Sequence, residues 1–178
     1  MKKFLLVMAA LSVIVSSAFA EESLIIDKEK GEIIIPAEVN GKYLVSPTKH
    51  ALSYYKIKPE DMKARNSSEG KSAEGSKLSV FLTWEGSNGE IPLDDAVISE
   101  VANGEARPLD LRFSGNLDFA MRSHPGCFIC LDSCAAGIST NAAWPTGAMN
   151  NKEVSFKGNA KVLPPDGTKV NVIVRLVK

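Results

Sequence analysis

The chain has 178 residues, with 21 basic and 21 acidic side chains and a formal net charge of 0. This balance excludes the strongly basic surface that is typical of nucleic-acid-binding proteins, so we expect no nucleic-acid partner. The length fits one globular domain with a substantial hydrophobic core.

Residues 1–20 are predicted to be a secretory signal peptide. Lys2 and Lys3 precede an apolar run, and residues 18–20 form a small-x-small cleavage pattern. The apolar run is short for a membrane-spanning helix, so we expect no stable membrane anchor after cleavage. Cleavage removes two lysines and no acid, which lowers the formal net charge from 0 to −2. We therefore expect Sec-type export of an unfolded chain to the periplasm or beyond.

The remaining chain, 21–178, is predicted to form a single domain rich in short strands. Alternating apolar and polar residues indicate strands at 78–84 and 170–177. Further strands are expected at 24–27, 32–36, 42–45, 109–113 and 154–157. Turns are expected at 28–31, 40–41 and 166–167. The polar, Gly/Ser-rich stretch 65–76 is predicted to be a flexible loop.

Three short helices are also expected. Ser46-Pro47 favours a helix over 48–57, because proline suits the first helical position. A second is expected at 94–101, and a third over 116–123, ending before Pro125. The whole pattern indicates an α+β fold, mainly antiparallel β and sandwich-like, with two or three short helices.

All three cysteines of the chain fall within eight residues, as C-x2-C-x3-C at Cys127, Cys130 and Cys134. Thiolates are soft ligands, so this spacing predicts a site for a 4Fe–4S cluster, zinc or copper(I). His124 extends the motif to a four-ligand set with bacterial cluster-binding spacing and histidine in the first place. Asp132 is a weaker candidate that would support a ligand by hydrogen bonding.

Other interpretations of the same cysteines stay open. A disulfide between Cys127 and Cys130 would leave Cys134 buried in a non-catalytic binding or structural domain without a cofactor. An oxidising compartment favours this alternative over a cluster. Positions 127, 130 and 134 also share one stripe of an α-helix, which fits packed cysteines. A thiol–disulfide redox protein would place Cys127 at a helix N-terminus, where the dipole lowers its pKa.

Few other residues suggest chemistry. His50 is a minor ligand candidate within the expected helix, and Trp144 is predicted to be a core residue. Asp94 and Asp95 fit the start of a helix. The sequence holds no Ser-His-Asp set and no phosphate-binding loop, so we do not expect an enzyme. A redox protein or a small ligand remains the expected partner.

Several segments resemble bacterial YdjY-type domains. The cysteine segment, 126–134, followed by residues 137–138 and 141–142, is the most specific part, and the resemblance spans nearly all of 24–178. The other matching segments are 36–43, 47–52, 74–78, 107–117 and 163–168. Such proteins are described as ferredoxin-like or 4Fe–4S proteins without established activity. The resemblance therefore implies electron transfer or redox sensing through the three cysteines. Ala135 stands where the family pattern implies proline, and the segment between His50 and Tyr54 is shorter.

Overall fold

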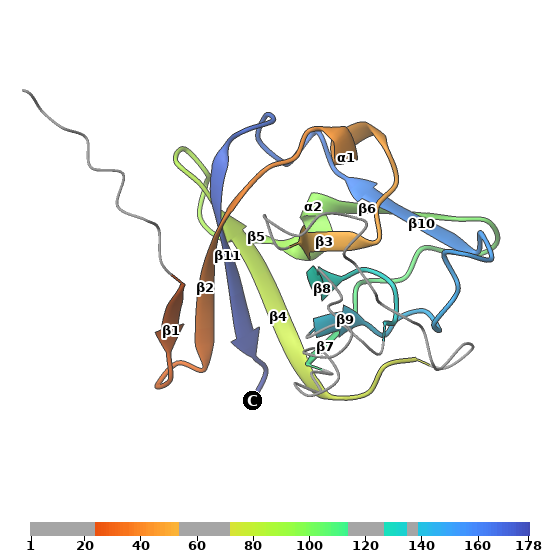
Figure 1. Cartoon of the computed structure of the whole chain (residues 1–178), viewed down its shortest axis with the longest axis horizontal. Coiled ribbons are helices and arrows are strands. Elements are labelled where there is room, and N and C mark those ends of the chain that lie inside the picture. Colours follow the sequence, from red (N-terminus) through yellow and green to blue (C-terminus); the bar gives the residue numbers. More distant parts are fainter. Residues whose placement is uncertain (1–23, 54–71, 114–126, 135–138) are drawn as a thin grey trace, which may run out of the picture.

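The computed structural model describes residues 24–53, 72–113, 127–134 and 139–178 (Figure 1). The predicted signal peptide, the helix expected over 116–123, His124 and most of the loop predicted for 65–76 lie outside these ranges. Within them, no helix is long and apolar enough to span a bilayer.

The described residues form short strands and two single-turn helices, which confirms the expected α+β, mainly antiparallel, sandwich-like fold. The helices are α1 (Lys42–Val45) and α2 (Leu93–Ala96). The strands are β1 (Ile25–Asp27), β2 (Glu32–Glu38), β3 (His50–Ser53), β4 (Ser76–Thr83), β5 (Ile91–Pro92), β6 (Val97–Val101), β7 (Leu111–Phe113), β8 (Cys127–Cys130), β9 (Ser139–Asn141), β10 (Val154–Gly158) and β11 (Lys169–Leu176).

Nine of the described strands join one sheet in the order β1-β2-β11-β4-β7-β9-β8-β3, with β5 paired to β4. The pairs are antiparallel except for β8 with β9. β4 joins the two halves, because its first residues pair with β7 while later residues pair with β11. β6 and β10 form a separate antiparallel ribbon.

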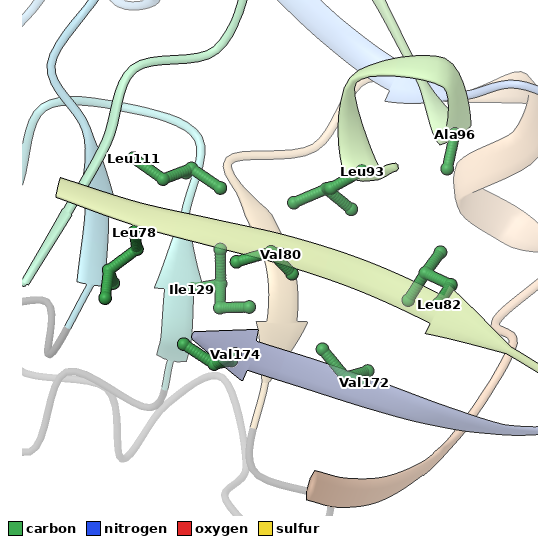
Figure 2. Packing of buried hydrophobic residues seen from close by; sticks show 9 residues of the cluster. All are labelled: Leu78, Val80, Leu82, Leu93, Ala96, Leu111, Ile129, Val172 and Val174. Carbon is green, nitrogen blue, oxygen red and sulfur yellow. The ribbon is translucent and has the colours of Figure 1, made fainter. Parts of the chain in front are cut away.

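The main core lies between β4 and β11 on one side and β7 and β8 on the other (Figure 2). Its alternating residues Leu78, Val80 and Leu82 point from β4 into this core, as the sequence pattern predicts. Ile129 of β8 enters it from the opposite side, and α2 closes one end with Leu93. A second core around Phe156 of β10 lies beside the loop that follows β8.

Two elements differ from the sequence-based expectation. The segment 42–45, expected to be a strand, forms helix α1. The segment 48–57, expected to be a helix, includes strand β3. The Asn40-Gly41 turn leads into a helical turn, because the Asn40 carbonyl accepts the Tyr43 amide at 3.0 Å. The Thr48 amide donates to the Phe156 carbonyl at 2.8 Å, which draws the next segment into extended pairing rather than a helix.

The other expectations agree more closely. β1 and β2 form the expected hairpin, and the ends of β4, β7, β10 and β11 lie within two residues of the predicted ends. The helix expected at 94–101 is only one turn, α2, and the chain then extends as β6. Pairing of β6 with β10 explains this early end, because each residue from Val97 to Val101 has a partner across the ribbon.

Two isoleucines provide a matched test of this core. Ile129 is 1% exposed, whereas Ile25 on the edge strand β1 is 55% exposed. Ile129→Ala should lower the free energy of unfolding by about 2–5 kcal/mol, because it leaves a cavity between the layers. Ile25→Ala should change it by no more than about 0.5 kcal/mol. Urea denaturation of both variants checks this; equal losses would contradict the arrangement.

Candidate cysteine site

Strand β8 places two of the cysteines on the same side through an irregular ladder. In a regular strand, residues three apart point to opposite faces. Here β8 pairs with β3 through shifted registers, in which Phe128 and Ala51 are each passed over. Such β-bulges re-aim side chains. Cys127 and Cys130 therefore meet in one cluster, while Ile129 between them enters the main core.

The helical placement of the cysteines is therefore wrong. Cys127 begins a strand rather than a helix, and Cys134 follows in a loop. The stripe expected for an α-helix and the helix N-terminus expected for a redox thiol are both absent from the described residues 127–134. The spacing fits one stripe of a helix, but a strand with two register shifts also brings positions 127 and 130 together.

The three thiols form a compact buried cluster. Cys127, Cys130 and Cys134 are 1%, 2% and 5% exposed, and none of the three forms a disulfide bond. The Cys130 thiol forms hydrogen bonds with both of the others. The cluster is thus centred on Cys130, with three soft donors gathered in a dry setting.

Backbone groups hold the central thiol. Cys130 Sγ donates to the Lys49 carbonyl at 3.4 Å, and the same carbonyl accepts the Leu131 amide at 2.7 Å. The backbone amide of Asp132 also hydrogen-bonds the Cys130 sulfur. By accepting these two hydrogen bonds, the Lys49 carbonyl links the start of β3 to the end of β8.

The electrostatics keep the Cys130 thiol protonated. The pKa of Cys130 is raised well above the ordinary range, first by its hydrogen bond with Cys127 and also by burial. The hydrogen bonds with Cys134 and with the Asp132 amide act in the opposite direction and only partly offset this rise. A neutral, buried thiol is a poor nucleophile.

The loop after β8 is fixed by polar side chains that the sequence did not single out as a site. Asn141 of β9 is fully buried, and its amide nitrogen donates to the Leu131 carbonyl at 3.1 Å. Its oxygen accepts the amides of Asp110 at 3.0 Å and Ala143 at 3.1 Å. Three of the four hydrogen bonds that one asparagine side chain can form are thus used to join three segments at the cysteine loop.

Ser133 provides a second attachment. Its hydroxyl oxygen accepts the backbone amide of Ala73, and its carbonyl accepts the hydroxyl of Thr146. These bonds join the loop to the segment before β4 and to the segment after β9. The cysteine loop is therefore held from several sides.

Asp132, the predicted supporting residue, is buried beside the cluster. One carboxylate oxygen accepts the Ser133 amide at 3.1 Å, and the other lies 4.0 Å from the ammonium nitrogen of Lys49. Lys49 also donates to the side chain of Asn150. Asp132 thus contacts Cys130 through its backbone, while its carboxylate faces the surface lysine.

The two histidines remain weaker candidates. His50 lies on β3 as the register partner of Cys130, whereas His124 lies outside the described residues. Across 24–53, 72–113, 127–134 and 139–178, no group of three or more His, Cys, Asp and Glu side chains is arranged as a ready metal site. The thiols touch one another, so an ion would require them to turn toward a shared centre.

Trp144 confirms the core prediction and borders the same loop. Its ring packs in the second core with Leu131 and Phe156. The Arg107 guanidinium lies 4.2 Å from the ring centroid and donates to the Ala143 carbonyl at 2.8 Å. The indole thus shields the loop on the side of the second core.

Comparison with known proteins gives one family. A family model described as "YdjY domain" matches residues 55–175, a range that includes all three cysteines. A similar curated protein is "Uncharacterized protein YdjY" of Escherichia coli (strain K12), with 29% identity over 184 residues. That alignment covers 88% of this chain and 80% of the relative. No solved structure matches the chain.

Removing the buried amide tests whether it holds the loop. Asn141→Ala leaves the Leu131 carbonyl and two backbone amides without a partner. We expect a loss of about 2–4 kcal/mol in the free energy of unfolding, with faster alkylation of the thiols in native protein. Asn151→Ala, at an exposed site, is the control. Unchanged alkylation in Asn141→Ala would contradict the role of the amide.

The raised pKa of Cys130 predicts a dependence of stability on pH. In metal-free, reduced protein, the unfolded chain loses the Cys130 proton near the ordinary thiol value of 9.0, whereas the native chain keeps it. The native state then binds more protons, so the free energy of unfolding falls as pH rises above about 9. Below that pH the contribution of this thiol is fully present.

The measurement is denaturant unfolding of the wild type and of Cys130→Ala from about pH 7 to pH 10. The alanine variant removes this titration while keeping every other ionisable group. We expect the wild type to lose more stability over this range. Parallel curves would contradict the raised pKa.

Proposed function

The chain belongs to the YdjY domain family, and from this premise we propose that it is an exported, non-enzymatic protein that binds a soft metal through Cys127, Cys130 and Cys134. The bound metal would serve electron transfer or redox sensing with a redox partner. The observation that carries this proposal is the contact of Cys130 with both other thiols in a site that is almost closed to solvent.

Metal binding accounts for this arrangement better than packing alone. Buried cysteines behave as small apolar residues, which packing can distribute anywhere in a core. Here every cysteine of the chain lies in one cluster, and a doubly bulged strand turns two of them to the same side. Soft thiolates are the ligands that zinc, copper(I) and iron–sulfur clusters take. In a dry setting, the attraction between a cation and its ligands is also stronger.

The Sec-type signal predicted for residues 1–20 supports an extracytoplasmic location. That location also favours the second candidate function, a binding or structural domain with a disulfide between Cys127 and Cys130. The two thiols lie in contact, so this pairing needs only local adjustment. Counting thiols separates the candidates.

The test uses the mature chain, 21–178, purified anaerobically and analysed for metal and for free thiols after denaturation without reductant. We expect about one metal centre per chain, and three thiols once the metal is removed. Each Cys→Ala substitution should lower metal affinity at least about tenfold. Ser155→Ala on β10 is the control and should bind as the wild type does.

Two results would decide against metal binding. Less than about 0.1 metal per chain, in protein with three free thiols, would leave the cluster as packing. One free thiol in the unreduced protein would support the disulfide. Circular dichroism of every variant would confirm that each one folds.

A further inference from the structure

The two ends of the main sheet differ in how well they are protected against further strand pairing. β3, at one end of the strand order, pairs with β8 through two register shifts, and bulges of this kind blunt a sheet edge. β1, at the other end, pairs with β2 in an unbroken register (Figure 1). It contains no proline or lysine, and its charged residue, Asp27, accepts amides of the following turn. Of the two edges, β1 is therefore the open one.

The side chains at the β1 edge are apolar and exposed. Leu24, immediately before β1, is 48% exposed, and Ile25 and Ile26 within the strand are 55% and 57% exposed. The backbone N–H and C=O groups of a strand point alternately to its two sides. The side of β1 away from β2 therefore presents a row of donors and acceptors. This edge fits another extended strand that has apolar side chains of its own.

The outer face of the sheet carries an apolar row that ends at the same edge. Phe81 alternates with the core residues of β4, so it faces away from the main core. Directly paired residues share a face, and the row continues through the paired residues Pro92, Phe81, Ile173, Ile34 and Ile25. The next row on this face contains the ion pair of Glu32 and Arg175. The apolar row is thus bordered by charge and ends, exposed, at Ile25.

The sequence of β1 points to a second copy of this chain as the strand that fits. Two β1 strands related by a twofold axis at Ile25 run antiparallel, with each Ile25 opposite its counterpart. Leu24 of one copy then faces Ile26 of the other, so all three pairs are apolar. An axis at Ile26 would place Leu24 against Lys28, and an axis midway between the isoleucines would place it against Asp27. The register centred on Ile25 avoids both mismatches.

We propose that the chain forms a twofold-symmetric dimer by antiparallel pairing of β1 with β1 of a second copy, centred on Ile25. The apolar row of one copy then continues into the row of the other. A twofold contact is closed, so the joined sheet ends at the bulged β3 of each copy. β1 and β8 lie near opposite ends of the strand order, so this surface is separate from the cysteine cluster and goes beyond the proposed function. A three-residue edge is small, so the dimer should dissociate on dilution.

The first experiment measures the average mass of the mature chain, 21–178, by sedimentation equilibrium from about 1 μM to about 1 mM. We expect the mass to rise toward that of a dimer with concentration. Ile25→Lys places like charges opposite each other at the axis and should weaken association at least about tenfold. Val45→Lys, at an 80% exposed site on α1, is the matched control and should associate as the wild type does. Circular dichroism checks that both variants fold.

The second experiment tests the register with single cysteines. The Cβ atoms of directly opposed residues lie about 4.5–5.5 Å apart, near the span of a disulfide, whereas diagonal neighbours lie about 7–8 Å apart. With oxidised glutathione, Ile25→Cys should form a linked dimer at least about tenfold faster than Ile26→Cys. Each link oxidises two protein thiols to one disulfide and reduces one glutathione disulfide to two thiols. The wild type, with its cysteines buried, is the control and should not link.

Three results would overturn the inference. A wild type that stays monomeric at every concentration would leave the edge to a different polypeptide. Association of Ile25→Lys as tight as that of the wild type would place the contact elsewhere on the surface. Equal rates of linking for Ile25→Cys and Ile26→Cys would contradict the pairing centred on Ile25.

Discussion

The doubly bulged pairing of β3 with β8 is the constraint on which the rest of the site depends. It turns Cys127 and Cys130 to one side of a strand whose regular form would separate them, while Ile129 between them fills the main core. One backbone carbonyl, that of Lys49, accepts both the Cys130 thiol and the Leu131 amide. Packing of the core and placement of the thiols are therefore set by the same few residues.

The cysteine loop also joins the two halves of the core. Ile129 belongs to the cluster between β4 and β8, whereas Leu131 packs with Trp144 and Phe156 in the second cluster. Asn141 donates a hydrogen bond to the Leu131 carbonyl. A bound ion would cross-link a loop that already connects both clusters. Metal binding should therefore raise the free energy of unfolding of the whole domain.

The sequence predicts what depends on local alternation and fails where distant pairing decides. Leu78, Val80 and Leu82 reveal the buried face of β4 directly. The segment after Pro47 has a good local helix start, but pairing with β8 draws it into a strand. The cysteine spacing shows which residues gather, yet it fits a helix as well as a bulged strand. The hydrogen bonds of Asn141 join segments 10 and 31 residues away along the chain, so local sequence does not reveal its role.

The distances between the three sulfur atoms in a crystal structure of the reduced, metal-free domain test the central claim most directly. The account predicts that Cys130 Sγ lies within about 4 Å of the sulfurs of both Cys127 and Cys134, the spacing that ligands of one ion require. A structure in which either sulfur points away from Cys130 into a separate part of the core would contradict it.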